Sequence, residues 1–221
     1  MSAAPKLVPV EDIPFGPPSD PQLYVGRAMS RHEWGVLIDR TGVKYERQRG
    51  RIVLPPQGMA GPTRKHNKTA DNVQSFLDRA FRDRGDDCTS YRADQAVYAP
   101  ELDRDTFPDV VASRGDEEFA EGDEDRVLLN PVLAVEVLSP STRGFDRDEK
   151  FAGYRSIPSL SEYLVVDPDR AAVELFRRQE GGWLMQPLTG LDAVARLESV
   201  GVDLPLAEVY RLVEPASRER Q

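Results

Sequence analysis

The sequence predicts a single α/β domain in which helices flank a mixed β-sheet. Three observations lead to this class: a long amphipathic pattern at residues 63–84, an apolar run at 132–138 broken by one glutamate, and an alternation of helical and strand-like segments. The length of 221 residues fits one domain of about 150 residues with extensions. We expect this domain at residues 28–213, after a proline-rich arm at 1–27 and before a short tail at 214–221.

The charge of the chain excludes one class of protein. Acids outnumber bases by 38 to 29, so the net charge is -9 and the chain cannot coat nucleic acid by bulk positive charge. Seven of these acids lie in residues 116–125, which we interpret as a solvated loop. Without that loop the net charge is -9 + 7 = -2, so the composition still allows a local phosphate-binding face.

The cysteine and histidine content excludes two further classes of site. One cysteine, Cys88, and two histidines, His32 and His66, cannot form a disulfide framework or a zinc site with four Cys/His ligands. No segment is apolar enough to span a membrane, and the N-terminal residues lack the apolar core of a signal peptide. We therefore expect a cytoplasmic protein that does not bind membranes.

The first half of the domain contains two predicted helices and a hairpin. Ser30 and Glu33 have the spacing of a capping box, which predicts a short helix with an apolar face. Residues 45–54 predict a hairpin around Gly50, because two strand-like runs flank a glycine. A long helix follows at 63–84, with apolar residues every three or four positions. The apolar positions of the two helices are Trp34, Leu37 and Ile38, and Ala70, Val73, Leu77, Ala80 and Phe81.

The second half is rich in β-forming residues. Strands are predicted at 91–98, 107–112, 132–138, 162–167, 172–177 and 183–188. A polar connection separates the first two strands, and a helix at 146–156 follows the strand at 132–138. The last two strands form a closing hairpin.

Glu136 is the most informative residue, because a carboxylate inside a strand that is buried on both faces needs a compensating charge. It shares its face of the strand with Ala134 and Leu138, and the small alanine leaves room for an ion. A buried ion pair with an arginine is the alternative interpretation.

Asp109 is the second acid, and it starts the strand that we expect beside Glu136. Its place in a Phe-Pro-Asp sequence also fits an ordinary turn residue. Two carboxylates at adjacent strand ends would form the oxygen-rich site that Mg²⁺ or Mn²⁺ prefers, with positions left for water and a substrate phosphate.

Lys150 lies on the helix that follows the Glu136 strand, so its amine could return to the two acids and face a phosphate or an attacking water. Tyr154, one turn later, could support it. The alternative is an exposed ion pair between Lys150 and Asp146, four residues earlier.

His66 lies on the apolar face of the long helix, where a hydrogen-bonded core histidine is the alternative to a functional one. The basic run at 64–68 opens the same helix. Such a run suits a phosphate, although most such runs are solvated surface.

Several motifs together resemble a known family. They are P-D-V-V at 108–111, A-V-E-V-L-S-P-S-T at 134–142, D-R-D-E-K at 146–150, Tyr154, and E-Y-L-V-V-D-P at 162–168. This pattern resembles the Uma-two family of predicted endonucleases, within the PD-(D/E)XK restriction-endonuclease-like superfamily. The resemblance covers about residues 28–212 and is strongest at 107–178.

The resemblance implies a restriction-endonuclease-like fold and a set of site residues. Asp109 and Glu136 would be metal ligands and catalytic acids, with a carbonyl oxygen near Val137 completing the metal site. The superfamily places a lysine two residues after the second acid, but that position here is Leu138, so the resemblance assigns the lysine role to Lys150. It also implies accessory roles for Glu46, in the hairpin, and for His66 and Tyr154.

Two functions from different classes follow. The first is a Mg²⁺- or Mn²⁺-dependent endonuclease that cleaves DNA, in which Lys150 orients a metal-activated water. A symmetric dimer would suit an enzyme that cuts two strands. The second is an inactive nuclease-fold module that binds nucleic acid or a protein partner. The two differ in whether the Lys150 amine lies within a few ångströms of the carboxylates.

Overall fold

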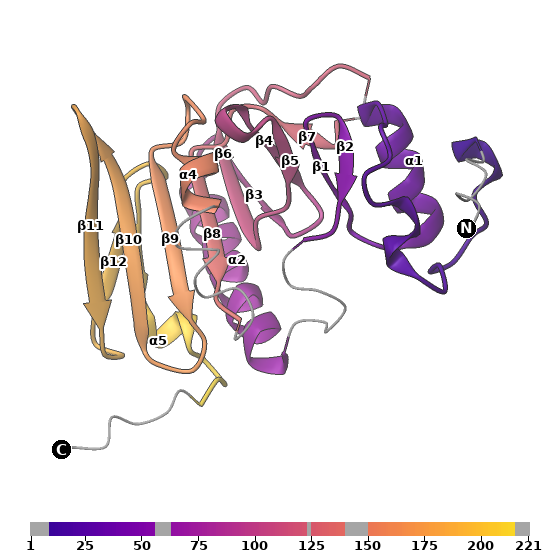
Figure 1. Ribbon diagram of the computed structural model, residues 1–221. Helices are drawn as coiled ribbons and strands as arrows, with labels where there is room; N and C mark the ends of the chain where they lie inside the picture. Colours follow the sequence, from indigo (N-terminus) through magenta and orange to yellow (C-terminus); the bar gives the residue numbers. More distant parts are fainter. Residues whose placement is uncertain (1–8, 56–62, 123–124, 140–149, 215–221) are drawn as a thin grey trace.

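The fold is built around a six-stranded mixed sheet with the strand order β11-β10-β9-β8-β6-β3 (Figure 1). The computed structural model describes residues 9–55, 63–122, 125–139 and 150–214. Strands β8 and β9 are parallel, and the other neighbours in this sheet are antiparallel. The strands are β3 Cys88–Arg92, β6 Val110–Arg114, β8 Leu133–Val137, β9 Glu162–Asp167, β10 Ala172–Gln179 and β11 Gly182–Thr189.

A second sheet of five strands, in the order β2-β1-β5-β4-β7, lies beside the first, and two further strands pair separately. The five strands are β1 Glu46–Gln48, β2 Arg51–Val53, β4 Ala96–Ala99, β5 Arg104–Thr106 and β7 Val127–Leu128. The separate pair is β12 Val194–Leu197 and β13 Val202–Pro205. The mixed α/β class is confirmed, but the prediction of one sheet was incomplete.

The predictions for residues 91–98 and for the connection after them were wrong, and the strands found there belong in part to the second sheet. The predicted strand at 91–98 is broken by a turn at residues 93–95, so β3 enters the large sheet and β4 the small one. The predicted polar connection after it contains the helical turn η3 Pro100–Leu102 and the buried strand β5. The apolar pattern of the sequence does not reveal β5, because this strand contains the charged residues Arg104 and Asp105. Both are buried because they form ion pairs.

The two longest helices begin at residues whose side chains cap them and end at glycines in the left-handed conformation. The Ser30 side chain accepts from the Glu33 amide, and the Glu33 carboxylate accepts from the Ser30 amide, so the capping box is confirmed. At the long helix the Thr63 side chain accepts from the His66 amide, without a reciprocal bond, and Gly85 ends the helix in the left-handed conformation. The α-helices are α1 Arg31–Thr41, α2 Arg64–Arg84, α4 Phe151–Tyr154 and α5 Leu206–Val209. Of the predicted helix at 146–156, residues 146–149 lie outside the described residues.

The N-terminal arm packs against the second sheet from residue 9 onwards. It contains two helical turns, η1 Val10–Asp12 and η2 Pro21–Tyr24, rather than a continuous extended segment. Val10 and Ile13 are buried in the cluster that contains Trp34. The Tyr45 hydroxyl donates to the carbonyl oxygen of Pro21 at 3.0 Å, which fastens the arm to the hairpin.

The two faces of the large sheet carry different cores. Odd-numbered residues of β8 pack with α2, in a cluster that includes Val73, Leu77 and Val135. Even-numbered residues pack on the opposite face with α4, in a cluster that includes Ala134 and Tyr154. Alternate side chains of a strand point to opposite faces, so β8 is enclosed from both sides. Helix α2 and helix α4 therefore approach the same strand from opposite directions.

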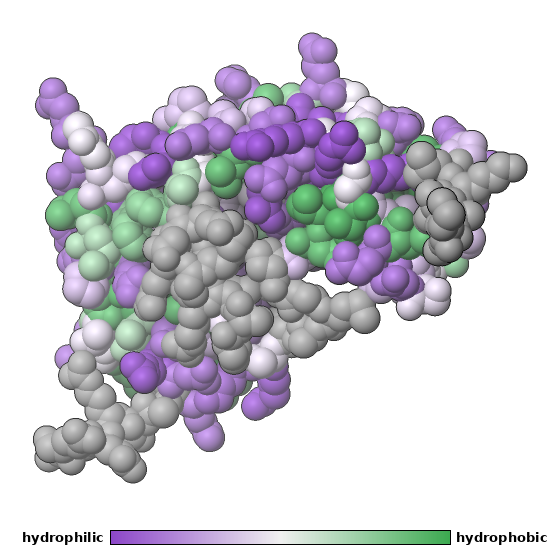
Figure 2. All heavy atoms as spheres, in the orientation of Figure 1, coloured by the Kyte–Doolittle hydropathy of each residue, from purple (hydrophilic) through white to green (hydrophobic). Residues whose placement is uncertain are grey.

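The surface in the view of Figure 2 is mixed in polarity. Apolar spheres gather over the region of β10 and β11, and the exposed apolar side chains of β11 are Leu184 and Met185. The acidic segment at 116–125 is largely exposed where it is described, although Ala120 is buried. Within the described ranges, no helix is long and apolar enough to cross a membrane.

Candidate active site

Glu136 lies in a strand that is buried along its whole length. All five residues of β8 are buried, and Glu136 itself is 0% exposed. Strands β6 and β9 flank β8 on its two edges. Its face of the strand carries Ala134 and Leu138, as the alternation predicts. A charge in this position requires close polar partners.

Helix α4 provides two partners for this carboxylate. The Lys150 ammonium lies 2.9 Å from Oε1 of Glu136, and the Tyr154 hydroxyl donates to the same oxygen at 2.7 Å. Lys150 and Tyr154 are one helical turn apart, so their side chains lie on one face of the helix. The alternative of an exposed lysine was wrong, because Lys150 is only 6% exposed. Asp146, its proposed surface partner, lies outside the described residues.

Tyr154 is held in its neutral, donating form. Burial, followed by the negative charge of Glu136, raises the pKa of the Tyr154 hydroxyl well above its usual range. The hydroxyl is therefore protonated throughout the physiological range and keeps donating to Glu136. A fixed donor on one side and a cation on the other hold Oε1 in a single position.

An aromatic cluster fixes α4 against the sheet. The Phe151 ring, next to Lys150 in sequence, lies 5.6 Å from the Tyr163 ring, 4.5 Å from Phe176 and 5.4 Å from Trp183, between ring centres. On the other side of α4, a Cβ at Gly153 would lie 2.8 Å from Cδ1 of Leu102 and 3.3 Å from Cβ of Ala99, so a larger residue there requires the Leu102 side chain to shift. The anchoring role of Phe151 was not predicted from the sequence, although its position beside Lys150 was a usable signal.

Asp109 lies at the neighbouring strand end. The pairing of Val110 with Val135 makes β6 the antiparallel neighbour of β8, which confirms the predicted adjacency. Oδ2 of Asp109 accepts from the Val137 amide at 2.8 Å and lies 3.1 Å from Nε2 of His66. The hydrogen bond from the Val137 N–H ties this carboxylate directly to the residue after Glu136. The prediction that Asp109 is only a turn residue does not account for these contacts.

His66 reaches Asp109 from α2, on the other side of the sheet. Burial alone would lower the pKa of His66, but the hydrogen bond and the charge of Asp109 raise it above its usual value. Burial alone would raise the pKa of Asp109, but His66, the charge of Lys150 and the Val137 amide together hold it below its usual value. Asp109 is therefore ionised at neutral pH. His66 is buried, as expected of a core histidine, and it also contacts the candidate site.

The site thus joins two groups at the ends of β6 and β8. One group contains His66 and Asp109, and the other contains Lys150, Glu136 and Tyr154. Side chains directly opposite each other in antiparallel strands have Cβ atoms about 5 Å apart, and Asp109 is one position beyond the Val110 pair. The electrostatic effect of Lys150 on both Asp109 and His66 is consistent with this proximity.

Glu46 occupies a different environment from the other predicted site residues. It lies in β1 of the second sheet, where it accepts from Nε of Arg104 at 2.6 Å and from the Thr106 hydroxyl at 2.7 Å. Among the described residues, it has no direct contact with Asp109, Glu136 or Lys150. Its charge is a minor cause of the raised pKa of Tyr154. The structure therefore places Glu46 near the site as part of an ion pair.

The donor atoms suit a hard cation with few protein ligands. No group of three or more His, Cys, Asp or Glu residues is arranged to hold a metal among the described residues. Magnesium needs fewer, because it keeps several waters and uses one or two carboxylates together with substrate phosphates. Within the described part of the chain, the two contacts of Asp109 use Oδ2, so Oδ1 is the oxygen of this carboxylate that would face a metal. The carbonyl oxygen of Val137 stays a predicted ligand.

Comparisons with known proteins agree with this architecture. A family model described as "Uma2: Putative restriction endonuclease" matches residues 31–207. An uncharacterized protein of Synechocystis sp. is 32% identical over 136 residues, 61% of this chain and 75% of that protein. Another from the same organism is 30% identical over 184 residues, 83% of this chain and 92% of that protein.

A solved structure shares the fold. It is the crystal structure of a putative nuclease belonging to DUF820 from Anabaena variabilis, with a TM-score of 0.62 and 17% sequence identity. The superposition covers 79% of this chain and 93% of that chain. The low identity means that this likeness bears on the fold alone.

Proposed function

Because the chain belongs to the Uma2 family of putative restriction endonucleases, we propose that it is a Mg²⁺- or Mn²⁺-dependent endonuclease that hydrolyses phosphodiester bonds in DNA. The observation that carries this proposal is the position of Lys150, whose ammonium lies 2.9 Å from Glu136 inside the protein. A buried acid and a buried lysine beside a second ionised acid are expensive to maintain, and such groups concentrate at functional sites.

Each residue has a role that its contacts support. Asp109 and Glu136 would hold the metal, since both carboxylates lie at the ends of adjacent strands. When bound, the metal would acidify a water molecule and neutralise charge on the phosphate. The Lys150 ammonium would orient that water and oppose the charge that grows on the phosphate oxygens.

Two residues position the acids rather than react. The Tyr154 hydroxyl fixes Oε1 of Glu136, and the His66 ring fixes Oδ2 of Asp109. Such partners orient ligand side chains and tune their charge, and their loss typically weakens metal binding or activity. We assign Glu46 an accessory electrostatic role at most, because Arg104 neutralises it.

The alternative, an inactive module that binds nucleic acid or a protein, is less well supported. A module has no need to gather two acids and a lysine in its interior, where each charge carries a desolvation cost. An exposed Lys150 would have favoured the module. Two copies acting on the two strands of a duplex would form a symmetric dimer, which we also propose.

The test is cleavage of supercoiled plasmid DNA by purified protein with Mg²⁺ or Mn²⁺, and with chelator as a control. We expect metal-dependent nicking by the wild type, and a loss of at least about a hundredfold in Asp109→Asn and in Lys150→Met. Arg177→Met is the matched control, because Arg177 pairs with the buried Glu162 away from the site. Equal activity in all four proteins would indicate a contaminant and would refute the proposal.

A further inference from the structure

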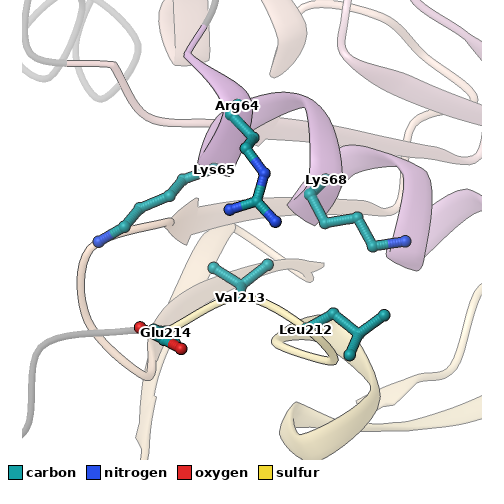
Figure 3. Close-up of a pocket in the computed structure, with 6 residues that line it drawn as sticks. All are labelled: Arg64, Lys65, Lys68, Leu212, Val213 and Glu214. Carbon is teal, nitrogen blue, oxygen red and sulfur yellow. The ribbon is translucent and has the colours of Figure 1, made fainter.

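A pocket lies between helix α2 and the segment that follows helix α5, outside the site described above (Figure 3). Its volume is about 150 Å³. Three basic side chains leave the first turns of α2: the Arg64 guanidinium points toward Val213, and the amines of Lys65 and Lys68 end on either side of it. The lining residues are Arg64, Lys65, Lys68, Leu212, Val213 and Glu214.

The wall opposite α2 is fixed by hydrogen bonds. The Asn72 amide donates to the carbonyl oxygen of Val209 at 3.0 Å and to that of Arg211 at 2.7 Å. The Tyr210 hydroxyl donates to the carbonyl oxygen of Asp167 at 2.9 Å, which ties the same segment to β9. The residues that lead into the wall are therefore fastened to α2 and to the end of β9, which holds the start of the wall in place.

The charge of the pocket matches one phosphodiester. Lys65 is paired with Asp169 at 3.4 Å, and Glu214 adds one negative charge to the lining. Arg64 and Lys68 have no hydrogen bond or ion pair with any other residue that the structure describes. Three cations and two acids leave a net charge of 3 - 2 = +1 in a chain whose total is -9. A phosphodiester carries one negative charge, and arginine binds it through paired donors.

The pocket and the candidate active site share one helix. His66 lies between two pocket residues in sequence, and its ring contacts Asp109. Opposite sides of a helix are separated by roughly 10 to 12 Å with side chains included. One strand of DNA carries a phosphate about every 3.4 Å along its axis, so one strand could reach both positions.

We propose that Arg64, Lys65 and Lys68 hold a phosphate of the DNA backbone on the strand that enters the active site, a few nucleotides from the cleaved bond. This inference rests on the proposed function and adds the position of the substrate. It also gives a role to the basic run at 64–68, which the sequence alone does not distinguish from solvated surface. The site positions DNA without reading its sequence, because it contacts phosphate.

The test measures DNA binding separately from cleavage. Binding of a labelled duplex in chelator is followed by fluorescence anisotropy at several salt concentrations. Arg64→Gln/Lys68→Gln should raise Kd about tenfold at low salt and reduce the slope of log Kd against log salt by about one. Arg79→Gln/Arg82→Gln removes the same charge from the other half of α2, and we expect little change there. In cleavage, the pocket variant should raise KM and leave kcat near the wild-type value.

The outcomes separate the two proposals. An unchanged Kd and salt slope in the pocket variant, or an equal change in the control variant, would overturn the pocket assignment even if the wild type cleaves DNA. Pocket-dependent binding without metal-dependent cleavage would overturn the proposed function and support the pocket. Binding of inorganic phosphate alone, without a pocket-dependent effect on DNA, would identify a free-anion site and overturn the inference.

Discussion

Replacing Lys150 with methionine should destabilise the protein by about 3 to 5 kcal/mol, because it leaves a buried charge without its cation. The carboxylate of Glu136 is 0% exposed and lies 2.9 Å from the ammonium. At that distance the Coulomb attraction is about 6 kcal/mol for an effective dielectric constant of about 20. In the wild type, the cost of desolvating the two charges offsets much of this attraction. In Lys150→Met the Glu136 carboxylate is still desolvated, but the attraction to the ammonium is lost.

Glu136→Gln should cost a similar amount for the opposite reason, since it leaves the Lys150 ammonium buried at 6% exposure. The double variant Glu136→Gln/Lys150→Met carries neither charge, and buried ion pairs replaced by neutral residues are often no less stable. We therefore expect the double variant to lose less than about 2 kcal/mol, far below the sum of the single losses. The difference measures the coupling between the two side chains.

Urea unfolding in chelator, at fixed pH and salt, gives the four free energies of this cycle. Additive losses, or single losses below about 1 kcal/mol, would show that the pair does not form and would refute this reasoning. Adding Mg²⁺ tests the metal site in the same experiment. The wild type should gain about 2.7 kcal/mol when free metal is a hundredfold above its Kd, and Glu136→Gln should not.

Three other perturbations test neighbouring parts of the structure. Tyr154→Phe removes the hydroxyl donor to Glu136, and we expect a stability loss of about 1 to 3 kcal/mol by urea unfolding; an unchanged midpoint would contradict the hydrogen bond. Ser30→Ala should lose about 1 kcal/mol in thermal melting, because the capping box of α1 is removed, whereas Ser75→Ala, at an exposed position inside α2, should leave the melting temperature unchanged. Burial raises the pKa of Tyr45 from 10.0 to about 12, so the stability that depends on its neutral hydroxyl is complete below pH 10 and is lost as pH rises to about 12. The free energies of unfolding of the wild type and Tyr45→Phe should therefore converge across that window, and a constant difference would show that the bond to Pro21 is not linked to this titration.

The sequence by itself determined the elements whose signals are local. The capping box at Ser30 and Glu33 predicted the start of α1, and the spacing from Ala70 to Phe81 predicted α2, because both signals depend on neighbours within one or two turns. The apolar run around Glu136 likewise predicted a strand enclosed on both faces, and the cost of burying a carboxylate predicted that it would have a cation nearby.

The tertiary structure decided which residues meet. The choice of Lys150 over an arginine as the partner of Glu136 depends on how the aromatic contacts of Phe151 seat α4, and these contacts join segments far apart in sequence. The same holds for Glu46, whose partner Arg104 lies in β5. This strand was not predicted, because its sequence is polar. It also holds for His66, whose contact with Asp109 requires α2 to pack against the face of β6 that carries Val110 and Ala112. The local sequence pattern indicates only whether a side chain is buried. The partner of a buried charge is set by the packing of elements that are distant in sequence, because the energy of that charge depends on distances of a few ångströms.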